Sequence, residues 1–195
     1  MMLLAKLRAK IRFAGLSNSV SISMIKYLVL FFLLFLQPVS VTATELSCTD
    51  PSFKWSKTRP AINLRHIFCG EIDYRGRAKG FHSKQLLASA THIARIKNKK
   101  MLRGGIYNGR VKFANGKSKF STFFPDHCTI GMIVRSTLFA ARNKTKDHYQ
   151  WGILGASAPA KNTAGYCLAH DGRPFTIRMG LSRNQRSIVT AFPQP

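Results

Sequence analysis

The chain has 195 residues and a formal net charge of +24, from 31 Lys and Arg against 7 Asp and Glu. Its hydrophobic fraction of 45% can build a core, which excludes a disordered polycation, and its length suits one compact domain better than two. The excess of positive charge predicts a polyanionic partner, which is a nucleic acid, an anionic membrane or an acidic protein.

The N-terminal segment has the pattern of a secretory signal peptide. Residues 27–36 form an apolar run of ten (YLVLFFLLFL), which follows a basic region and precedes small residues that end at Ala43. A membrane-spanning helix needs ~20 apolar residues, so we expect a signal peptide over residues 1–43, cleaved after Ala43, and no stable membrane association afterwards. A retained anchor is the alternative, and Met24 is an alternative initiator. The mature protein is expected to be secreted or periplasmic.

The cysteines all follow this segment, at Cys48, Cys69, Cys128 and Cys167. An even number of cysteines in an exported chain predicts two disulfides, and the sequence leaves three connectivities open. His66-x-x-Cys69 and Cys167-x-x-His170 also have the spacing of zinc ligands, so a Cys2His2 zinc site is a weaker alternative.

The first half of the mature chain gives mixed signals. Residues 44–60 are polar and carry two prolines, which predicts an N-terminal arm or loop. Residues 63–72 fit either a strand or a short helix that leads into a turn. Residues 83–96 have apolar side chains near helical spacing and predict a short helix, and the basic run 97–100 predicts a solvated loop.

The second half is clearer. Residues 105–113 alternate apolar and polar side chains, Asn115-Gly116 is a strong hairpin turn, and residues 117–124 follow as a second strand. Pro125-Asp126 then opens the best helical pattern in the chain, with its apolar face at Ile130, Ile133, Val134, Thr137, Leu138 and Ala141. Short β-like runs follow at residues 149–154, 165–168, 175–179 and 187–192. This order predicts a single α+β domain, here taken as residues 61–195.

Two histidines are the strongest candidates for chemistry. His66 and His82 are 16 residues apart, and the glycines between them can fold both imidazoles toward one point. An imidazole has an ordinary pKa of ~6.5 and suits acid–base catalysis near neutrality. RNA cleavage without a metal needs a base for the ribose 2′-OH, an acid for the departing 5′ oxygen and a cation beside the phosphorane.

The residues around these histidines resemble the bacterial EndoU endoribonuclease family. Four motifs occur in the family's order: HIF-x-G at residues 66–70, GFHS at 80–83, STFFP at 121–125, and TAFP at 190–193, where the family has T-A-Y-P. Together they span nearly all of the mature chain. The resemblance implies an EndoU-like fold, with short antiparallel sheets and a few helices.

The resemblance also implies roles for the catalytic residues. His82 matches the general base and His66 the general acid. In eukaryotic and viral members the catalytic lysine lies four residues before a serine, which selects Lys117 before Ser121. Lys119 is the alternative, because it lies on the same face of the expected strand.

Three further residues are implied to bind substrate. Ser121 is expected at a uracil edge and Thr190 near the catalytic group, since single-stranded RNA is recognised by bonds to base edges and by stacking. Phe192 stands where the family usually has tyrosine. It retains a ring for stacking and loses the hydroxyl.

The sequence therefore predicts a secreted, metal-independent and cofactor-free endoribonuclease. It is expected to cleave single-stranded RNA at uridines by 2′-OH attack and to leave a 2′,3′-cyclic phosphate. A toxin role, with a cognate immunity protein as partner, fits this reading, and the protein is expected to be a monomer. The alternative is a non-catalytic secreted basic protein that binds RNA or other polyanions.

Overall fold

The computed structural model of the protein describes residues 46–145 and 151–194. The chain divides into two compact units, Met1–Thr44 and Glu45–Pro195, and the described residues belong to the second. The predicted signal peptide lies outside the described residues. Among the residues that are described, no helix is long and apolar enough to cross a membrane.

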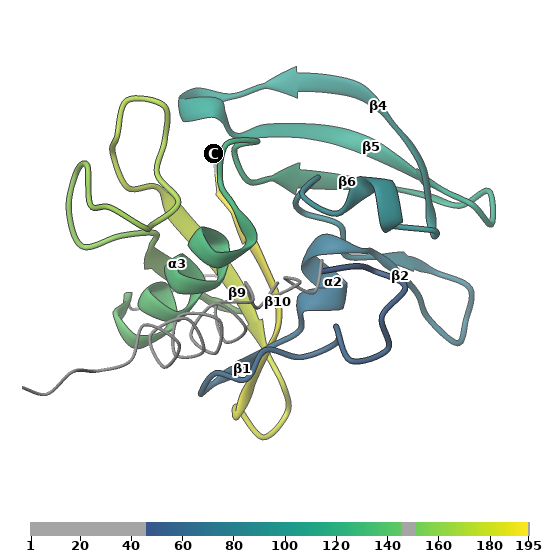
Figure 1. The fold of residues 1–195 in the computed structure, drawn as a ribbon, viewed down its shortest axis with the longest axis horizontal. Helices are drawn as coiled ribbons and strands as arrows, with labels where there is room; N and C mark the ends of the chain where they lie inside the picture. Colours follow the sequence, from purple (N-terminus) through teal and green to yellow (C-terminus); the bar gives the residue numbers. More distant parts are fainter. Residues whose placement is uncertain (1–45, 146–150, 195) are drawn as a thin grey trace, which may run out of the picture. The chain divides into compact units, whose positions relative to one another are not determined.

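The largest sheet has five strands and forms the centre of the domain (Figure 1). Its strands are, in spatial order, β1 (Ala61–Ile62), β10 (Ser187–Pro193), β9 (Thr176–Leu181), β8 (Ile153–Ala156) and β7 (Lys144–Thr145). β1 pairs parallel with β10, and every other pairing in this sheet is antiparallel. The pairing brings Ala61 next to Ser187, so the first and the last strand of the domain lie side by side in one sheet.

Helix α3 (Ile130–Arg142) packs against β8 and β9. It begins where the Thr129 side chain accepts a hydrogen bond from the Met132 amide, a common helix N-cap. Ile133 and Thr137 of its predicted apolar face are buried in the core, together with Ala140. The predicted helix is confirmed, although it begins after the turn at residues 125–129.

A second, three-stranded antiparallel sheet has the order β4 (Ile93–Met101), β5 (Tyr107–Phe113) and β6 (Ser118–Phe123). Gly116 has a φ of 80° in the turn between β5 and β6, a conformation that glycine adopts without strain. This hairpin is confirmed. The helix predicted over residues 83–96 is wrong, as is the loop over 97–100. Residues 93–100 belong to β4, and in the part before β4 only a 3-10 turn, η1 (Leu87–Ser89), is helical.

The reason for this error is non-local pairing. Ile93 and Ile96 pair with Phe113 and Val111 across β5, so both isoleucines reach the core from a strand. Their spacing of three fits a helix equally well in the sequence, and the cross-strand pairs decide for the strand.

Residues 63–72 form both elements that the sequence allowed. Helix α2 (Leu64–Phe68) is followed by β2 (Glu71–Ile72), which pairs with β3 (Ala78–Lys79) in a small antiparallel ribbon. The few helices and short antiparallel sheets make this a small α+β domain, as predicted.

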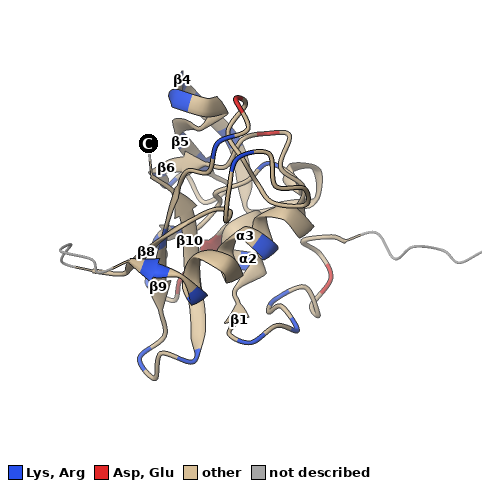
Figure 2. Ribbon diagram, turned by 90° about the vertical axis from the view of Figure 1, so that its left-hand side faces the viewer, with Lys and Arg blue, Asp and Glu red and all other residues tan. Residues whose placement is uncertain are grey.

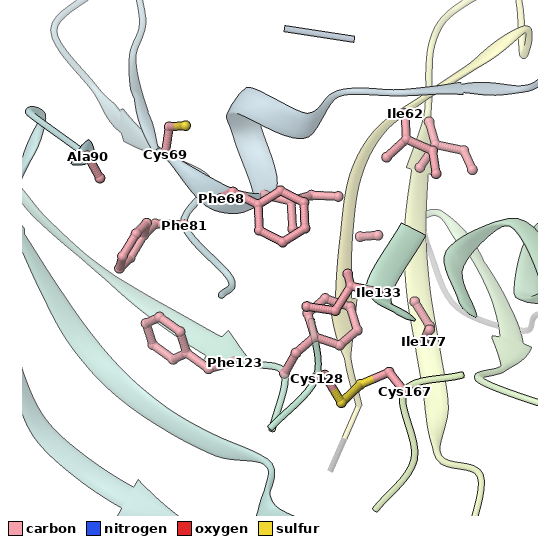
Figure 3. Packing of buried hydrophobic residues seen from close by; sticks show 14 of the residues in the cluster. Ile62, Phe68, Cys69, Phe81, Ala90, Phe123, Cys128, Ile133, Cys167 and Ile177 are labelled. Carbon is pink, nitrogen blue, oxygen red and sulfur yellow. A yellow bond between two sulfur atoms is a disulfide. The ribbon is translucent and has the colours of Figure 1, made fainter. Parts of the chain in front are cut away.

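The hydrophobic core joins the two larger sheets (Figure 3). Phe68 and Phe81 from the α2 region, Phe123 from β6 and Ile133 from α3 are all fully buried there. The run at residues 165–168, predicted as a strand, is a loop, in which Cys167 bonds to α3 through the Ser136 hydroxyl.

Two disulfides link Cys48 to Cys69 and Cys128 to Cys167, which confirms the predicted number and resolves the connectivity. The first disulfide ties the segment before residue 60 to the end of α2. Phe53 from the same segment is buried, with its ring centre 6.3 Å from that of Phe68. The described part of the predicted N-terminal arm is therefore packed against the domain.

Candidate active site

The two histidines singled out in the sequence line one cavity of about 340 Å³. The cavity lies where β6, β10 and the β3–His82 segment come together, and β6 contacts both β3 and β10. Its remaining lining includes Lys79, Lys119, Phe120, Ser121, Thr122, Trp151, Thr190 and Phe192.

His66 is held in place by the residues that start and follow α2. The Asn63 side chain caps the helix by accepting a hydrogen bond from the His66 amide at 3.0 Å. The His66 Nδ1 lies 2.8 Å from Glu71 Oε2, and Asn63 Nδ2 donates to the other Glu71 oxygen at 3.4 Å. Because a carboxylate only accepts, Nδ1 carries the hydrogen and Nε2 is the nitrogen left to face the cavity.

The environment of this pair favours the charged form of Glu71. Burial raises the pKa of the Glu71 carboxyl, but the hydrogen bond and positive charge of His66 outweigh that effect, so the pKa lies below its usual value. The resulting carboxylate compensates positive charge on the His66 ring, whose side chain is 15% exposed.

His82 is held by backbone bonds to α2. The Phe81 amide donates to the His66 carbonyl and the His82 amide to the Ile67 carbonyl, both at 2.7 Å. Gly80 makes this approach feasible, because it has a φ of 69° and a Cβ there would overlap the His66 carbonyl. Phe81 itself has a φ of 65°, which is strained for a bulky residue.

The His82 ring is oriented from two sides. Its Nδ1 donates to the Thr122 carbonyl at 3.0 Å, and Phe192 stacks on the ring with centroids 5.1 Å apart. The hydrogen is therefore assigned to Nδ1, which leaves the Nε2 lone pair for the cavity. Burial, and then the charges of Lys119 and His66, lower the pKa of His82 well below its usual 6.5.

The two imidazoles thus lie close together in opposite surroundings. Their ring centres are 6.0 Å apart and their planes differ by 31°. One ring is buried and kept neutral, and the other is paired with a carboxylate. Two ionisable groups whose surroundings differ in this way are suited to act as base and acid in one reaction.

Lys119, rather than Lys117, lies beside these rings. Its Nζ donates to the Gly80 carbonyl at 2.9 Å and to Ser121 Oγ at 3.1 Å, and burial lowers its pKa to about 8. Lys117 precedes β6, and its side chain is exposed at the hairpin turn. The structure thus places Lys119, the alternative that the sequence offered, at the cavity and Lys117 away from it: the pleat of β6 turns residues 119, 121 and 123 inward, and residue 117 falls outside the strand.

Ser121 is placed to support Lys119 and His82. The side chain is almost inaccessible, at 2% exposure, and its hydroxyl donates to the Phe81 carbonyl at 2.7 Å. Its oxygen also lies 3.2 Å from His82 Nδ1. Because the Ser121 hydroxyl is already hydrogen-bonded inside the domain, its burial does not favour the expected contact with a uracil edge.

Thr190 and Phe192 are on β10, half-buried at the cavity wall. Among the described residues the Thr190 hydroxyl has no hydrogen-bond partner, so it is available to a ligand. Trp151 adjoins Phe192, with ring centres 5.9 Å apart, and is 53% exposed. The Arg178 guanidinium lies over the indole at 5.3 Å and donates to the Trp151 carbonyl.

A model of the bacterial EndoU nuclease family matches residues 61–195, which include both histidines, Lys119 and the β10 residues. The chain belongs to this family. A protein of Bacillus cereus named "Toxin" is 37% identical to the chain over 101 residues, which cover 49% of this chain and 18% of that protein. The chain spans less than a fifth of the length of this relative. No solved structure matches the chain.

In this EndoU nuclease the zinc alternative is overturned by the disulfides. All four sulfurs are in disulfide bonds, so no thiolate is available as a ligand. His66 instead binds Glu71, and His170 lies against His127 with ring centres 5.0 Å apart.

Several residues of the site were missed by sequence reasoning, among them Glu71 and Trp151. Glu71 had a signal, because it is one of only seven acids and directly follows the HIF-x-G motif. Trp151 had no signal in the sequence, because it is brought to the cavity by the pairing of β8 with β9 and of β9 with β10, which the sequence does not predict.

Proposed function

We propose that this EndoU nuclease is an endoribonuclease that cleaves single-stranded RNA through the substrate's own 2′-OH, without a metal or a cofactor. The observation that carries the proposal is the pair of histidines, each with Nδ1 engaged by the protein and Nε2 left for the cavity. A neutral ring, a carboxylate-paired ring and a neighbouring ammonium supply every proton and charge that this reaction needs.

The reaction follows from these assignments. The Nε2 lone pair of His82 takes the proton from the 2′-OH, and the oxygen attacks the adjacent phosphorus. The bond to the 5′ oxygen breaks, and that oxygen takes a proton from Nε2 of protonated His66. The products are a 2′,3′-cyclic phosphate and a free 5′-OH, and the two histidines have exchanged protonation states.

Lys119 is proposed to stabilise the charge that develops on the phosphorane oxygens. Its ammonium is held by two acceptors and is partly shielded from water, so it needs little reorganisation when the charge appears. Ser121 fixes its position. Lys119 thus takes the role that the sequence had given to Lys117.

The preference for uridine is a finer proposal that rests on the wall of the cavity. Thr190 offers a free hydroxyl to a base or ribose. Phe192 stacks on His82 and thereby also orients this histidine, the general base of the reaction. Trp151 presents an exposed ring at the rim of the cavity. Base stacking on an aromatic side chain contributes ~1–3 kcal/mol per base.

A toxic role outside the producing cell is proposed on separate grounds. The named toxin of Bacillus cereus shares 37% identity over half of this chain. Two disulfides suit an oxidising compartment, and residues 27–43 have the pattern of a signal peptide. An immunity protein would then protect the producer. Expression of the domain in a bacterial cell, with His82→Ala as control, should arrest growth only with the unaltered histidine.

The chemical proposal is tested by the ends of the product. The mature protein is incubated in EDTA with a uridine-containing oligonucleotide, and the fragments are examined by mass spectrometry. We expect a 2′,3′-cyclic phosphate at the new 3′ end, and none with His66→Ala or His82→Ala. Tight binding with no cleavage by the unaltered protein would favour the non-catalytic alternative.

A further inference from the structure

The outer face of the three-stranded sheet is strongly basic. Along β5, Tyr107, Gly109, Val111 and Phe113 point into the domain, so the residues between them point outward. The register pairs Arg110 with Lys97 of β4 and with Phe120 of β6, so these three side chains form one row on the outer face.

A second basic row lies next to the first. Arg95 pairs with Lys112, two residues along each strand from Lys97 and Arg110, or ~6.8 Å away. We call Arg95, Lys97, Arg110, Lys112 and Phe120 the basic sheet face. Figure 2 shows basic residues on β4.

This arrangement is unfavourable for the protein alone. Two like-charged pairs stand directly opposite each other, and such cross-strand pairs destabilise a sheet. Within the described residues none of the four cations has a carboxylate within 4 Å. The sequence has no acid between Asp73 and Asp126, where it has thirteen Lys and Arg. A polyanion bound here would relieve this repulsion.

The basic sheet face continues into the catalytic cavity. Phe120 is 59% exposed, belongs to the first basic row and also lines the cavity. Thr122, two residues further along the same outer side of β6, lines the cavity as well and holds His82 through its carbonyl. A strand of RNA that leaves the cavity at this edge would meet Phe120 first and the paired cations next.

We propose that the basic sheet face binds the part of the RNA that flanks the cleavage site, with Phe120 stacking a base and the two rows contacting phosphates. The inference rests on the proposed function and adds to it that the substrate is a single strand longer than the cavity holds. An exposed aromatic ring among cations is the arrangement that binds single-stranded nucleic acid, and an acidic protein would not need the ring.

The test compares two double variants of equal charge loss. Lys97→Gln/Arg110→Gln alters the basic sheet face. Arg183→Gln/Arg186→Gln is the control, since both arginines are exposed in the turn between β9 and β10, at the other end of β10 from the cavity. The probe for binding is a single-stranded RNA with deoxyuridine at the cleavage position. Cleavage is measured on a uridine dinucleotide, which is too short to reach the sheet.

For each lost phosphate contact we expect the affinity for the long probe to fall about fourfold at 0.15 M salt, because the log–log salt slope changes by ~0.7 per contact on a single strand. The face variant should then bind about fifteenfold more weakly, while the control variant binds as the unaltered protein does. Dinucleotide cleavage should not change. Phe120→Ala should weaken binding of the long probe about fivefold or more.

Thermal unfolding provides the check on folding. Removing both cations of the like-charged Lys97–Arg110 pair should leave the Tm unchanged or raise it, so lost binding cannot be attributed to unfolding. The inference is overturned if the face variant and the control variant bind the probe equally. It is also overturned if polyglutamate competes as well as RNA of equal charge and Phe120→Ala has no effect, because an acidic protein is then the partner. Failure to cleave the dinucleotide would refute the proposed chemistry, and the binding comparison would still decide the role of the basic sheet face.

Discussion

Replacing Lys119 by alanine should abolish most of the turnover, while the same change at Lys117 should not. Lys119 is the ammonium beside His82, and Lys117 lies two residues earlier, exposed at the hairpin turn. The pair is a matched comparison, because the residue type is the same and the positions are neighbours in one hairpin.

Two physical effects give the expected loss of turnover in Lys119→Ala. Removal of one preorganised donor to a developing negative charge costs ~2.7–4 kcal/mol, or about 10²–10³ in kcat. A unit charge about 4 Å from another, at an effective dielectric constant of ~20, contributes about 4 kcal/mol, which agrees with the upper end of that range. For Lys117→Ala we expect kcat to be unchanged and RNA affinity to fall at most about fourfold at 0.15 M salt, the effect of one lost phosphate contact.

The pH dependence of kcat should also report on Lys119. Burial lowers the pKa of Lys119 to about 8, so the ammonium loses its proton as the pH rises through that value. We expect kcat to decline above pH 8 in the unaltered protein and in Lys117→Ala. The measurement is steady-state kinetics at saturating RNA over the pH range. Full turnover in Lys119→Ala, or loss of turnover in Lys117→Ala alone, would refute the assignment.

Three further predictions follow from the described contacts. Glu71→Gln should lower kcat with little change in RNA affinity, because the amide compensates less charge on protonated His66; a higher KM with unchanged kcat would contradict this. Trp151→Ala should raise KM by about fivefold or more, the loss of one stacked base, and equal KM values would show that the ring does not contact substrate. Reduction of both disulfides should cost about 3 and 4 kcal/mol for the 21- and 39-residue separations, measured by denaturant unfolding.

Strong local signals made part of the fold predictable. The Asn115-Gly116 turn and the alternating strands beside it fixed the hairpin, and the helical apolar spacing fixed α3. Both patterns are short-range, so the residues that encode them are neighbours in the sequence. β4 was not predictable in this way, since its isoleucines have helical spacing and become a strand only by pairing with β5.

The candidate site was predictable in its histidines and not in its lysine. The motifs that contain His66 and His82 are joined by backbone hydrogen bonds between α2 and the segment after Gly80, so the two histidines have one relative position. The lysine depends on where the hairpin turn ends and β6 begins, and a shift of this start by one or two residues changes which side chain reaches the cavity. The spacing to Ser121 carries no information on that point.

The position of Glu71 after the HIF-x-G motif drew attention to this residue, but its contact with His66 could not be predicted from the sequence alone. A separation of five residues does not predict a contact, because it requires α2 to end at Phe68 and β2 to turn back at once. Asn63 makes this geometry specific by binding both the His66 amide and the Glu71 carboxylate.

The central claim is that the two histidines use the substrate's own 2′-OH, and one substrate tests it directly. The substrate is a deoxyoligonucleotide with a single ribouridine, incubated with the protein in EDTA. We predict one cut, immediately 3′ of the ribouridine, a 2′,3′-cyclic phosphate at that end, and no cut in the fully deoxy strand. Cleavage at a deoxy position, or a linear phosphate formed without a cyclic intermediate, would contradict the account.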